Sequence, residues 1–526
     1  MVADPLMPST KSVHHWTTTN LGEAAPGVLT PLGLALWGRP AELATRRATY
    51  VVGMFSKAEL AIPDDPAEWI LRPFYGRLAL RLEYMATVGD RAPGTTGPEA
   101  MRSLFGDVPD GMTFSPTKRR YPAIAARLPV AMAAFPGKLI EVTTEQDQWW
   151  RSTVARVGAM DEHEARAAFA QGMRRFDRCT SLQLVGILSN FRPLYDALEA
   201  LVSELGVGDL AVLSGAGGAE MQVVSDIWRA SRGELSVADV QREHGFHGPL
   251  EGEVSGTVWR EDARPLGKLI EQYAGRDDAE DPQTHGERTA RAREAMQAEV
   301  LRAVPAAKRP GTKLLLRLAA ERIPLRGVAK RSFLQAIDAS RASARRLGEL
   351  LPFDDPEDVF YLTGPELLGR LPPDVKELVA ARRAKRLEYQ GFHFAATEWA
   401  GLPECVPIET GPVDSDVTTL SGTGVSAGVV EGVARVVTDP SFTDVDDDDI
   451  LVAATTDPSW SSIMFVSSAL VVDLGGALSH AAVVARELQI PCVVNTRNGT
   501  RVIRSGDVVR VDGGAGTVEI LSRAEE

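Results

Sequence analysis

The chain has 526 residues, of which 44% are apolar and 24% are charged, a balance typical of globular domains rather than of collagen, coiled coils or disordered tails. Its 71 acidic and 57 basic residues give a formal net charge of −14, which makes nucleic acid and anionic lipid poor partners. The N-terminus lacks the apolar stretch of a signal peptide, and no apolar run approaches the ~20 residues of a membrane span. We therefore expect a cytoplasmic protein that crosses no membrane. Three widely spaced cysteines predict neither a disulfide framework nor a thiolate metal site.

The first 60 residues contain a Thr-, Gly- and Pro-rich opening, which indicates irregular structure leading into a helix. From about 60 to 400, apolar residues recur every three or four positions for many turns, as in 160–204 and 289–304. This spacing predicts amphipathic helices. We therefore predict a mainly α-helical domain over residues 1–406.

The pattern changes near residue 410. Residues 407–424 show no clear period and are predicted to form a linker. After them, short apolar runs alternate with glycine turns, which is typical of strands, and two helices fit between these runs, at 459–467 and 479–488. We predict a compact α/β domain over 425–526, so the chain as a whole is expected to be multidomain.

The segment VVDLGGALSHAAVVAREL (471–488) contains the clearest chemical signal. A strand is followed by Gly475 and Gly476, and then by Ser479 and His480 where a helix begins. Glycines let the backbone approach a bound group closely, and the free N–H groups of a first helical turn favour an anion such as phosphate. A neutral imidazole is a nucleophile at pH 7, so His480 is a candidate carrier of a phosphoryl group. Taken alone, the motif also fits a Ser479 cap followed by an exposed histidine.

In its context, this region resembles the phosphohistidine swivelling domain of the phosphoenolpyruvate-utilising enzymes. That family includes phosphoenolpyruvate synthase, rifampicin phosphotransferase and phenylphosphate synthase. The matching segments are TDPSW (456–460), GGALSHAAVVARELQIPCVV (475–494) and GDVVRVDGGAGTVEIL (506–521). The resemblance implies that His480 is transiently phosphorylated, with Thr456 and Arg486 near the phosphate loop. Arg486 also fits an outward-facing arginine on a helix.

Parts of the helical region are similar to rifampicin phosphotransferase-like proteins. These parts are WTTTNLGEAAPGVLTPLGLALW (16–37), HGFHGPLEGEVSGTVWREDARPL (244–266) and EDVFYLTGPEL (357–367). The resemblance implies that this region binds the phosphoryl acceptor, a small organic molecule. The candidate pocket residues are His244, His247, Glu251, Asn20 and Glu23. Structural turns and helix caps are the alternatives for them, and the acceptor itself is not specified by the sequence.

The family normally carries an ATP-grasp domain before the segment that begins at Trp16, and only 15 residues precede it here. The GAGGAE segment (215–220) lacks the Lys-Ser/Thr pair of a phosphate-binding loop. The resemblance therefore implies a phosphotransferase component whose ATP and Mg²⁺ are bound by a separate ATP-grasp protein, with no metal site in this chain. The alternatives are a non-catalytic ligand-binding or regulatory protein that retains the swivelling fold, and a phosphocarrier of the phosphoenolpyruvate synthase type.

Overall fold

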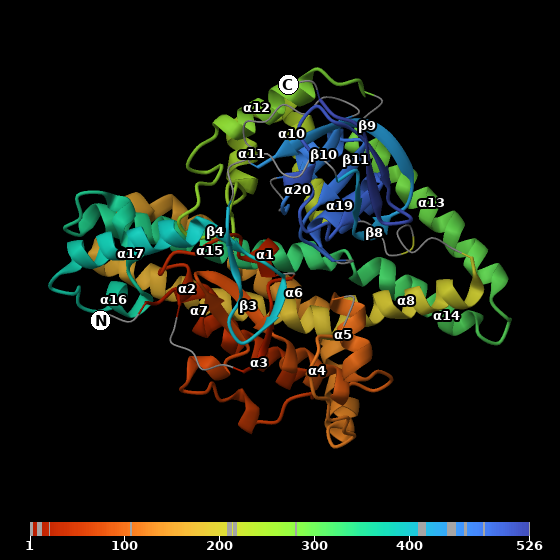
Figure 1. Cartoon of the computed structure of the whole chain (residues 1–526), viewed down its shortest axis with the longest axis horizontal. Helices are drawn as coiled ribbons and strands as arrows, with labels where there is room; N and C mark the ends of the chain where they lie inside the picture. Colours follow the sequence, from red (N-terminus) through yellow and green to blue (C-terminus); the bar gives the residue numbers. More distant parts are fainter. Residues whose placement is uncertain are drawn as a thin grey trace. The chain divides into compact units, whose positions relative to one another are not determined.

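The computed structural model of the chain (Figure 1) falls into two compact units. It describes residues 4–7, 13–19, 21–105, 108–207, 213, 218–278, 281–408, 417–438, 449–456, 460–476 and 479–524. Unit 1 comprises Met1–Ser189, Leu250–Gly256 and Ala329–Thr410, and unit 2 comprises Asn190–Pro249, Thr257–Val328 and Gly411–Glu526. The helical region predicted as 1–406 is therefore divided between the two units. The predicted linker 407–424 lies partly outside the described residues.

Unit 1 is built mainly from helices, as the apolar spacing predicts. These are α1 (Leu21–Ala24), α2 (Leu34–Trp37), α3 (Arg39–Val51), α4 (Leu82–Arg91), α5 (Gly97–Phe105), α6 (Tyr121–Arg156), α7 (Glu162–Gly186), most of α15 (Leu325–Leu350), α16 (Gly364–Leu368) and α17 (Val375–Gln390). Short 3-10 turns lie at Ala58–Leu60, Pro66–Glu68, Val157–Ala159 and Pro356–Tyr361. Asp161 and Glu164 form a reciprocal capping box that starts α7, and this satisfies two main-chain donors of its first turn.

Unit 1 also contains two small antiparallel sheets that the sequence does not predict. The larger has the order β2-β3-β1-β5, and the smaller pairs β4 with β6. The strands are β1 (His15–Thr17), β2 (Leu71–Phe74), β3 (Arg77–Arg81), β4 (Phe392–Phe394), β5 (Glu398–Ala400) and β6 (Cys405–Pro407). Trp16 is fully buried at the centre of the larger sheet, with its ring centroid 5.1 Å from that of Phe74. These strands have only three to five residues, which is too short for an alternating pattern to distinguish them in the sequence.

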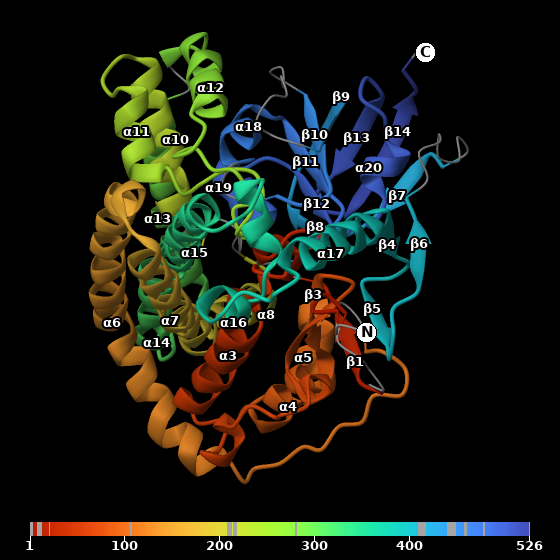
Figure 2. The same cartoon turned by 90° about the vertical axis from the view of Figure 1, so that its left-hand side faces the viewer.

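Unit 2 combines helices with an eight-stranded sheet (Figure 2). Its helices are α8 (Arg192–Leu205), which follows a π-helical turn (Ile187–Phe191), α10 (Gly218–Ser231), α11 (Val237–His244), α12 (Arg264–Ala274), α13 (Pro282–Ala303), α14 (Arg309–Arg322), α18 (Ser461–Val466), α19 (His480–Leu488) and α20 (Gly499–Val502). Its strands are β7 (Thr419–Ser421), β8 (Thr423–Ser426), β9 (Val429–Val437), β10 (Ile450–Ala453), β11 (Ala469–Val472), β12 (Cys492–Val494), β13 (Val508–Asp512) and β14 (Thr517–Ser522).

The centre of this sheet is parallel. In the order β7-β14-β13-β9-β10-β11-β12-β8, the strands from β9 to β12 run parallel and the outer ones antiparallel. Every residue of β10 and β11 is buried, which explains their unbroken apolar sequences, because a central parallel strand is covered on both faces. The predicted fold class, a mainly helical region followed by a C-terminal α/β domain, is confirmed.

One apolar core joins the helices α10 and α12 to the C-terminal sheet within unit 2. Trp228 and Tyr273 from the helices share this core with Met464 of α18 and Ala482 of α19. The rings of Tyr273 and Phe465 are stacked, with centroids 6.0 Å apart. The C-terminal α/β domain is therefore packed against helices that precede it by about 200 residues in the chain.

One helix has the length and composition of a possible membrane span, although it contains no unbroken apolar run of about 20 residues. Among the described residues, the helical stretch Tyr121–Ala159 is long and apolar enough by length and composition, with a mean hydropathy of 1.4 over an 18-residue window. Arg127 and Lys138 interrupt its apolar run, which is why a search for an unbroken run misses it. A single helix of this kind is weak support for a span, and α6 packs against α7 within unit 1.

Candidate functional site

His480 is the first residue of α19, directly after the loop that follows β11. The neighbouring strand β10 runs parallel to β11, so their carboxyl ends lie at the same edge of the sheet. Thr456 follows β10, while Gly475 and Gly476 follow β11. This edge is where open α/β sheets usually place binding sites.

The imidazole of His480 contacts the hydroxyl of Thr456, with 3.0 Å between Nδ1 and Oγ1. Both residues are 2% exposed, so water has little access to this hydrogen bond. Ser479 caps α19, because its Oγ accepts a hydrogen bond from the N–H of Ala482 at 3.2 Å. The N–H of Ser479 in turn donates to the carbonyl of Gly476 at 2.9 Å. The structure thus brings Thr456, Gly476, Ser479 and His480 together.

The loop before α19 turns at a glycine. Gly475 has a φ of +156°, a value that residues with a Cβ rarely adopt. The main chain needs this conformation directly after β11 to turn toward Gly476 and the cap of α19. The first glycine of the pair, Gly475, is therefore explained by the main-chain conformation of this turn.

Asp473 follows β11 directly and lies in the same loop as Gly475 and Gly476, and sequence reasoning did not single it out. Its carboxylate accepts hydrogen bonds from the hydroxyl of Thr496 at 2.8 Å and from the N–H of Thr500 at 3.2 Å, as well as from the Thr500 hydroxyl. Burial raises the pKa of Asp473, while these hydrogen bonds act in the opposite direction. The bonds tie the end of β11, and with it the glycine loop, to the start of α20. An acidic residue that closes an apolar strand was the available signal.

Arg486 lies in the last turn of α19, about 9 Å along the helix axis from His480. Its Nε donates to the carbonyl of Val425 at 2.8 Å, and its guanidinium carbon lies 5.5 Å from the centroid of the Tyr195 ring. These contacts tie α19 to β8 and to α8 within unit 2. The implied role of Arg486 at the phosphate loop stays a prediction.

Two of the expected acceptor-pocket residues, His244 and His247, lie in unit 2. His244 is 1% exposed, with its Nε2 2.9 Å from a carboxylate oxygen of Asp226. Burial raises the pKa of Asp226, but hydrogen bonds from His244 and Gln222 outweigh burial and hold that pKa below its usual value. The His244 and His247 rings are stacked with centroids 6.3 Å apart, and the His247 carbonyl accepts from the N–H of Trp259 at 2.8 Å. The buried His244–Asp226 pair had no signal in the sequence, because 18 residues separate its members.

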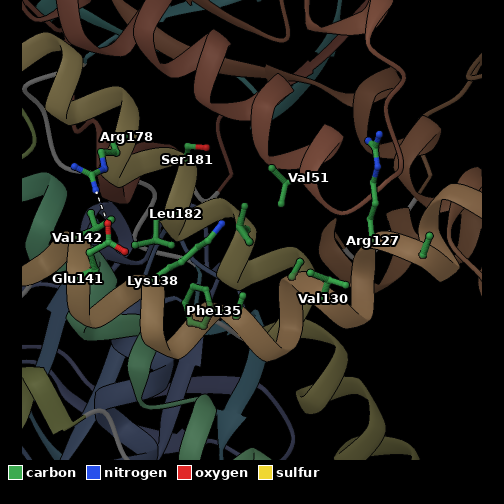
Figure 3. Close-up of a pocket in the computed structure, with 14 residues that line it drawn as sticks. Val51, Arg127, Val130, Phe135, Lys138, Glu141, Val142, Arg178, Ser181 and Leu182 are labelled. Carbon is green, nitrogen blue, oxygen red and sulfur yellow. Dashed lines mark hydrogen bonds and ion pairs between the residues drawn. The ribbon is translucent and has the colours of Figure 1, made fainter.

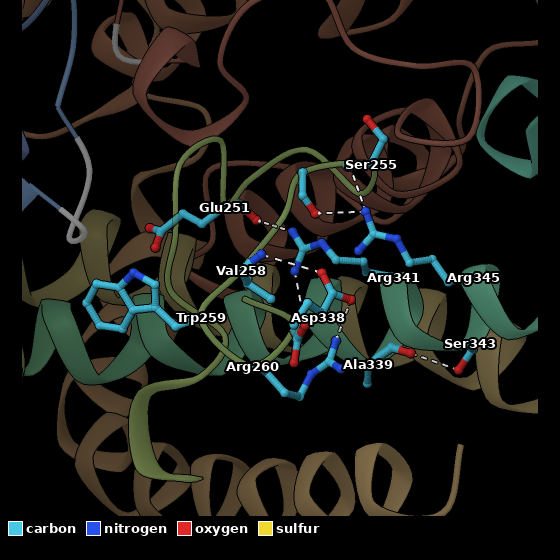
Figure 4. A network of polar contacts seen from close by, with 12 residues as sticks. Glu251, Ser255, Val258, Trp259, Arg260, Asp338, Ala339, Arg341, Ser343 and Arg345 are labelled. Carbon is cyan, nitrogen blue, oxygen red and sulfur yellow. Dashed lines mark hydrogen bonds and ion pairs between the residues drawn. The ribbon is translucent and has the colours of Figure 1, made fainter. Parts of the chain in front are cut away.

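The third expected residue, Glu251, lies in unit 1 within a network of buried polar groups (Figure 4). It is 3% exposed, and the Nζ of Lys330 lies 3.9 Å from its carboxylate. The guanidinium of Arg341, itself fully buried, donates to the main-chain carbonyl of Glu251 at 3.0 Å and pairs with Asp338 at 3.1 Å. Sequence reasoning did not find Arg341 or Asp338, which share one face of α15. Asn20 and the side chain of Glu23 lie outside what the structure describes.

Residues 445–516, which include His480 and its loop, match the family model described as PEP-utilising enzyme, mobile domain. The C-terminal domain is therefore similar to the mobile domains of PEP-utilising enzymes. Residues 236–327, which hold α11 to α14 of unit 2, match the rifampicin phosphotransferase fourth domain. The resemblance inferred from the motifs around His480 is therefore confirmed. The segment 445–516 lies in unit 2, and so does 236–327 apart from Leu250–Gly256, which belongs to unit 1.

Curated relatives match parts of the chain. An uncharacterized protein of Mycobacterium tuberculosis is 38% identical over 241 residues, which are 44% of this chain and 28% of that protein. Rifampicin phosphotransferase of Streptomyces sviceus is 39% identical over 189 residues (35% of this chain, 21% of the relative), and that of Bacillus subtilis is 32% identical over 210 residues (38% and 23%). The matches thus span about a quarter of the length of these relatives. A solution structure of Enzyme I covers 34% of this chain and 65% of that chain at 18% identity, and its TM-score of 0.15 is too low to carry an argument.

Proposed function

We propose that this chain is a phosphotransferase component in which His480 carries a phosphoryl group from a donor to a small organic acceptor. The observation that supports this role is the position of His480 at the start of α19, with its Nδ1 3.0 Å from the hydroxyl of Thr456 and beside the loop of Gly475 and Gly476. The match of this domain to the PEP-utilising mobile domains and the relatives named rifampicin phosphotransferase support phosphoryl-transfer chemistry at the level of the family.

The hydrogen bond to Thr456 determines which ring nitrogen reacts in this proposal. When the Nδ1–H of His480 donates to the Thr456 hydroxyl oxygen, the lone pair of the neutral ring is on Nε2. Nε2 attacks the donor phosphorus, an N–P bond forms, and the bond to the leaving oxygen breaks with its electron pair going to that oxygen. The N–H groups of the first turn of α19 favour the negative charge that arrives there.

The second step returns the histidine to its starting state. An acceptor hydroxyl oxygen attacks the phosphorus, the N–P bond breaks, and its electron pair returns to Nε2. The proton of the acceptor hydroxyl passes to a base. His244, held against the carboxylate of Asp226 at 2.9 Å, is our proposed base among the expected acceptor residues of unit 2.

Burial places a condition on this function. At 2% exposure, the His480 ring meets neither a donor nor an acceptor in the described arrangement. Transfer therefore requires a second arrangement in which this edge of the sheet is open. The hydrogen bond to Thr456 gives Nδ1 of the His480 ring a polar partner while water is excluded from the ring.

We propose ATP as the donor, bound with Mg²⁺ on a separate ATP-grasp protein, because the family resemblance implies it. Within the described parts of the chain, no group of three or more His, Cys, Asp or Glu side chains is arranged to hold a metal ion. We assign no step to Mg²⁺ on this chain.

Labelling of His480 tests the proposal. The full chain is incubated with ATP labelled in its β- and γ-phosphates and with a separately produced ATP-grasp protein, and the label is mapped by mass spectrometry. We expect an acid-labile, base-stable label on His480 that His480→Gln abolishes. The matched control is His163→Gln, because His163 is exposed on α7 of unit 1 and its loss should leave the label unchanged. A label that survives in His480→Gln, or a wild-type chain that takes no label, would contradict the proposal.

A further inference from the structure

A groove in unit 1 contains none of the residues assigned so far. Its volume is about 500 Å³, which lies within the ~300–1,000 Å³ typical of small-molecule sites. The long helix α6 forms one wall, and α7 with Val51 of α3 forms the other (Figure 3). The groove therefore has two walls and is a concave site rather than one exposed helix face.

The groove is apolar along most of its length. Val130 and Phe135 line it from α6, and Leu182 and Val185 line it from α7. Phe135 is 1% exposed, whereas Val130 is 65% exposed. The site thus runs from a buried floor to an open rim, and the apolar side chains at the rim remain in contact with water until something covers them.

The α6 wall of the groove carries two basic side chains, Arg127 and Lys138, and one acidic side chain, Glu141. Between Tyr121 and Ile140 the sequence of α6 contains Arg127 and Lys138 and no acidic residue, in a chain whose net charge is −14. Arg127 is held in place, because it donates to the Tyr50 carbonyl at 3.0 Å and its guanidinium carbon lies 4.2 Å from the centroid of the Tyr50 ring.

Lys138 is the cation that remains for a ligand. It is exposed and extends toward the groove (Figure 3), and it forms no ion pair with any carboxylate of the described residues. Arg178 on the opposite wall is already paired, because its guanidinium lies 3.5 Å from the carboxylate of Glu141. An ammonium beside an apolar trough is complementary to a molecule that carries one negative charge on an apolar body.

We propose that this groove binds an amphipathic organic anion. The apolar body of the ligand, an aromatic system or an alkyl chain, lies against Val130, Phe135 and Leu182. Its carboxylate, sulfonate or phenolate group lies at Lys138. This binding does not depend on phosphoryl transfer at His480, so its test stands apart from the test of the proposed function.

Binding of a fluorescent anion tests the inference directly. The full chain is titrated with 1-anilinonaphthalene-8-sulfonate, and sodium dodecanoate serves as a competitor. We expect saturable binding to one site that dodecanoate displaces. Val130→Asp should weaken it by about tenfold or more, because the new carboxylate must be buried against an anion. Lys138→Gln should weaken it severalfold and remove most of its salt dependence.

The control is Ile140→Asp. Ile140 is 68% exposed on the same helix and does not line the groove, so this variant should bind the dye as the wild type does. Circular dichroism checks that all variants keep their helix content. Equal losses in Val130→Asp and Ile140→Asp, or dye binding without saturation, would overturn the proposal.

A second arm distinguishes a free anion from a lipid surface or a protein helix. The chain is sedimented with vesicles of phosphatidylcholine and phosphatidylglycerol and, separately, titrated with an acidic amphipathic helical peptide. We expect neither to displace the dye. Binding to the vesicles or the peptide that depends on Val130, with no saturable binding of the dye or dodecanoate, would assign the groove to that partner and overturn the small-molecule proposal.

Discussion

Replacing Thr456 by valine tests the role given to the hydrogen bond on His480. Valine keeps the branched Cβ of threonine but lacks the hydroxyl that lies 3.0 Å from Nδ1. Because both side chains are 2% exposed, water does not readily take the place of that hydroxyl. The substitution therefore weakens the preference for the ring form that carries its proton on Nδ1 and its lone pair on Nε2.

The expected magnitude follows from the burial of the pair. A buried donor that loses its partner costs ~1–3 kcal/mol, and each 1.36 kcal/mol corresponds to a factor of ten in rate. If the productive ring form carries this cost, Thr456→Val slows phosphorylation of His480 by about 5- to 150-fold. Thr456→Ser keeps the hydroxyl and should stay within about threefold of the wild type.

Two measurements decide the outcome. Rapid-quench labelling gives the rate of phosphorylation, and ¹⁵N NMR of the imidazole shows which nitrogen carries the proton. We expect a protonated Nδ1 in the wild type and in Thr456→Ser, and a larger share of protonated Nε2 in Thr456→Val. A Thr456→Val variant that keeps both the wild-type rate and the wild-type ring form would refute the reasoning, as would a Thr456→Ser variant that loses as much as the valine variant.

Two further predictions concern unit 2. Burial raises the pKa of Asp507, but hydrogen bonds from main-chain N–H groups and from Arg523 outweigh burial and lower that pKa. The Asp507 carboxylate therefore stabilises the fold at pH values above its unfolded pKa of about 4. This stabilisation is lost as the pH falls through the lowered pKa of the folded state. Asp507→Asn should reduce the free energy of unfolding at pH 7 by about 1.5–3 kcal/mol, with a difference from the wild type that shrinks as pH is lowered toward about 3 in urea titrations. Tyr273, 1% exposed and stacked on Phe465, contributes about 3 kcal/mol of packing, so Tyr273→Ala should speed modification of His480 by diethyl pyrocarbonate. An unchanged rate would show that this shared core does not shield the ring.

The surroundings of His480 could be predicted from the sequence because the signals there are local. A run of buried apolar residues forms β11, a glycine pair permits the turn, and Ser479 caps the helix that His480 begins. Each of these signals lies within about two helical turns of the next, so no distant contact was needed to interpret them. The same reasoning correctly separated a mainly helical region from a C-terminal α/β domain.

The partners of these local elements depend on the fold. Periodicity shows that α12 has an apolar face, but only the tertiary structure shows that Tyr273 on this face meets Phe465 across nearly 200 residues of chain. The contact of Asp473 with Thr500 and the pairing of His244 with Asp226 arise in the same way. A local pattern indicates which surface must be buried or which group needs a hydrogen bond. The partner of that surface or group is determined by the packing of the whole chain.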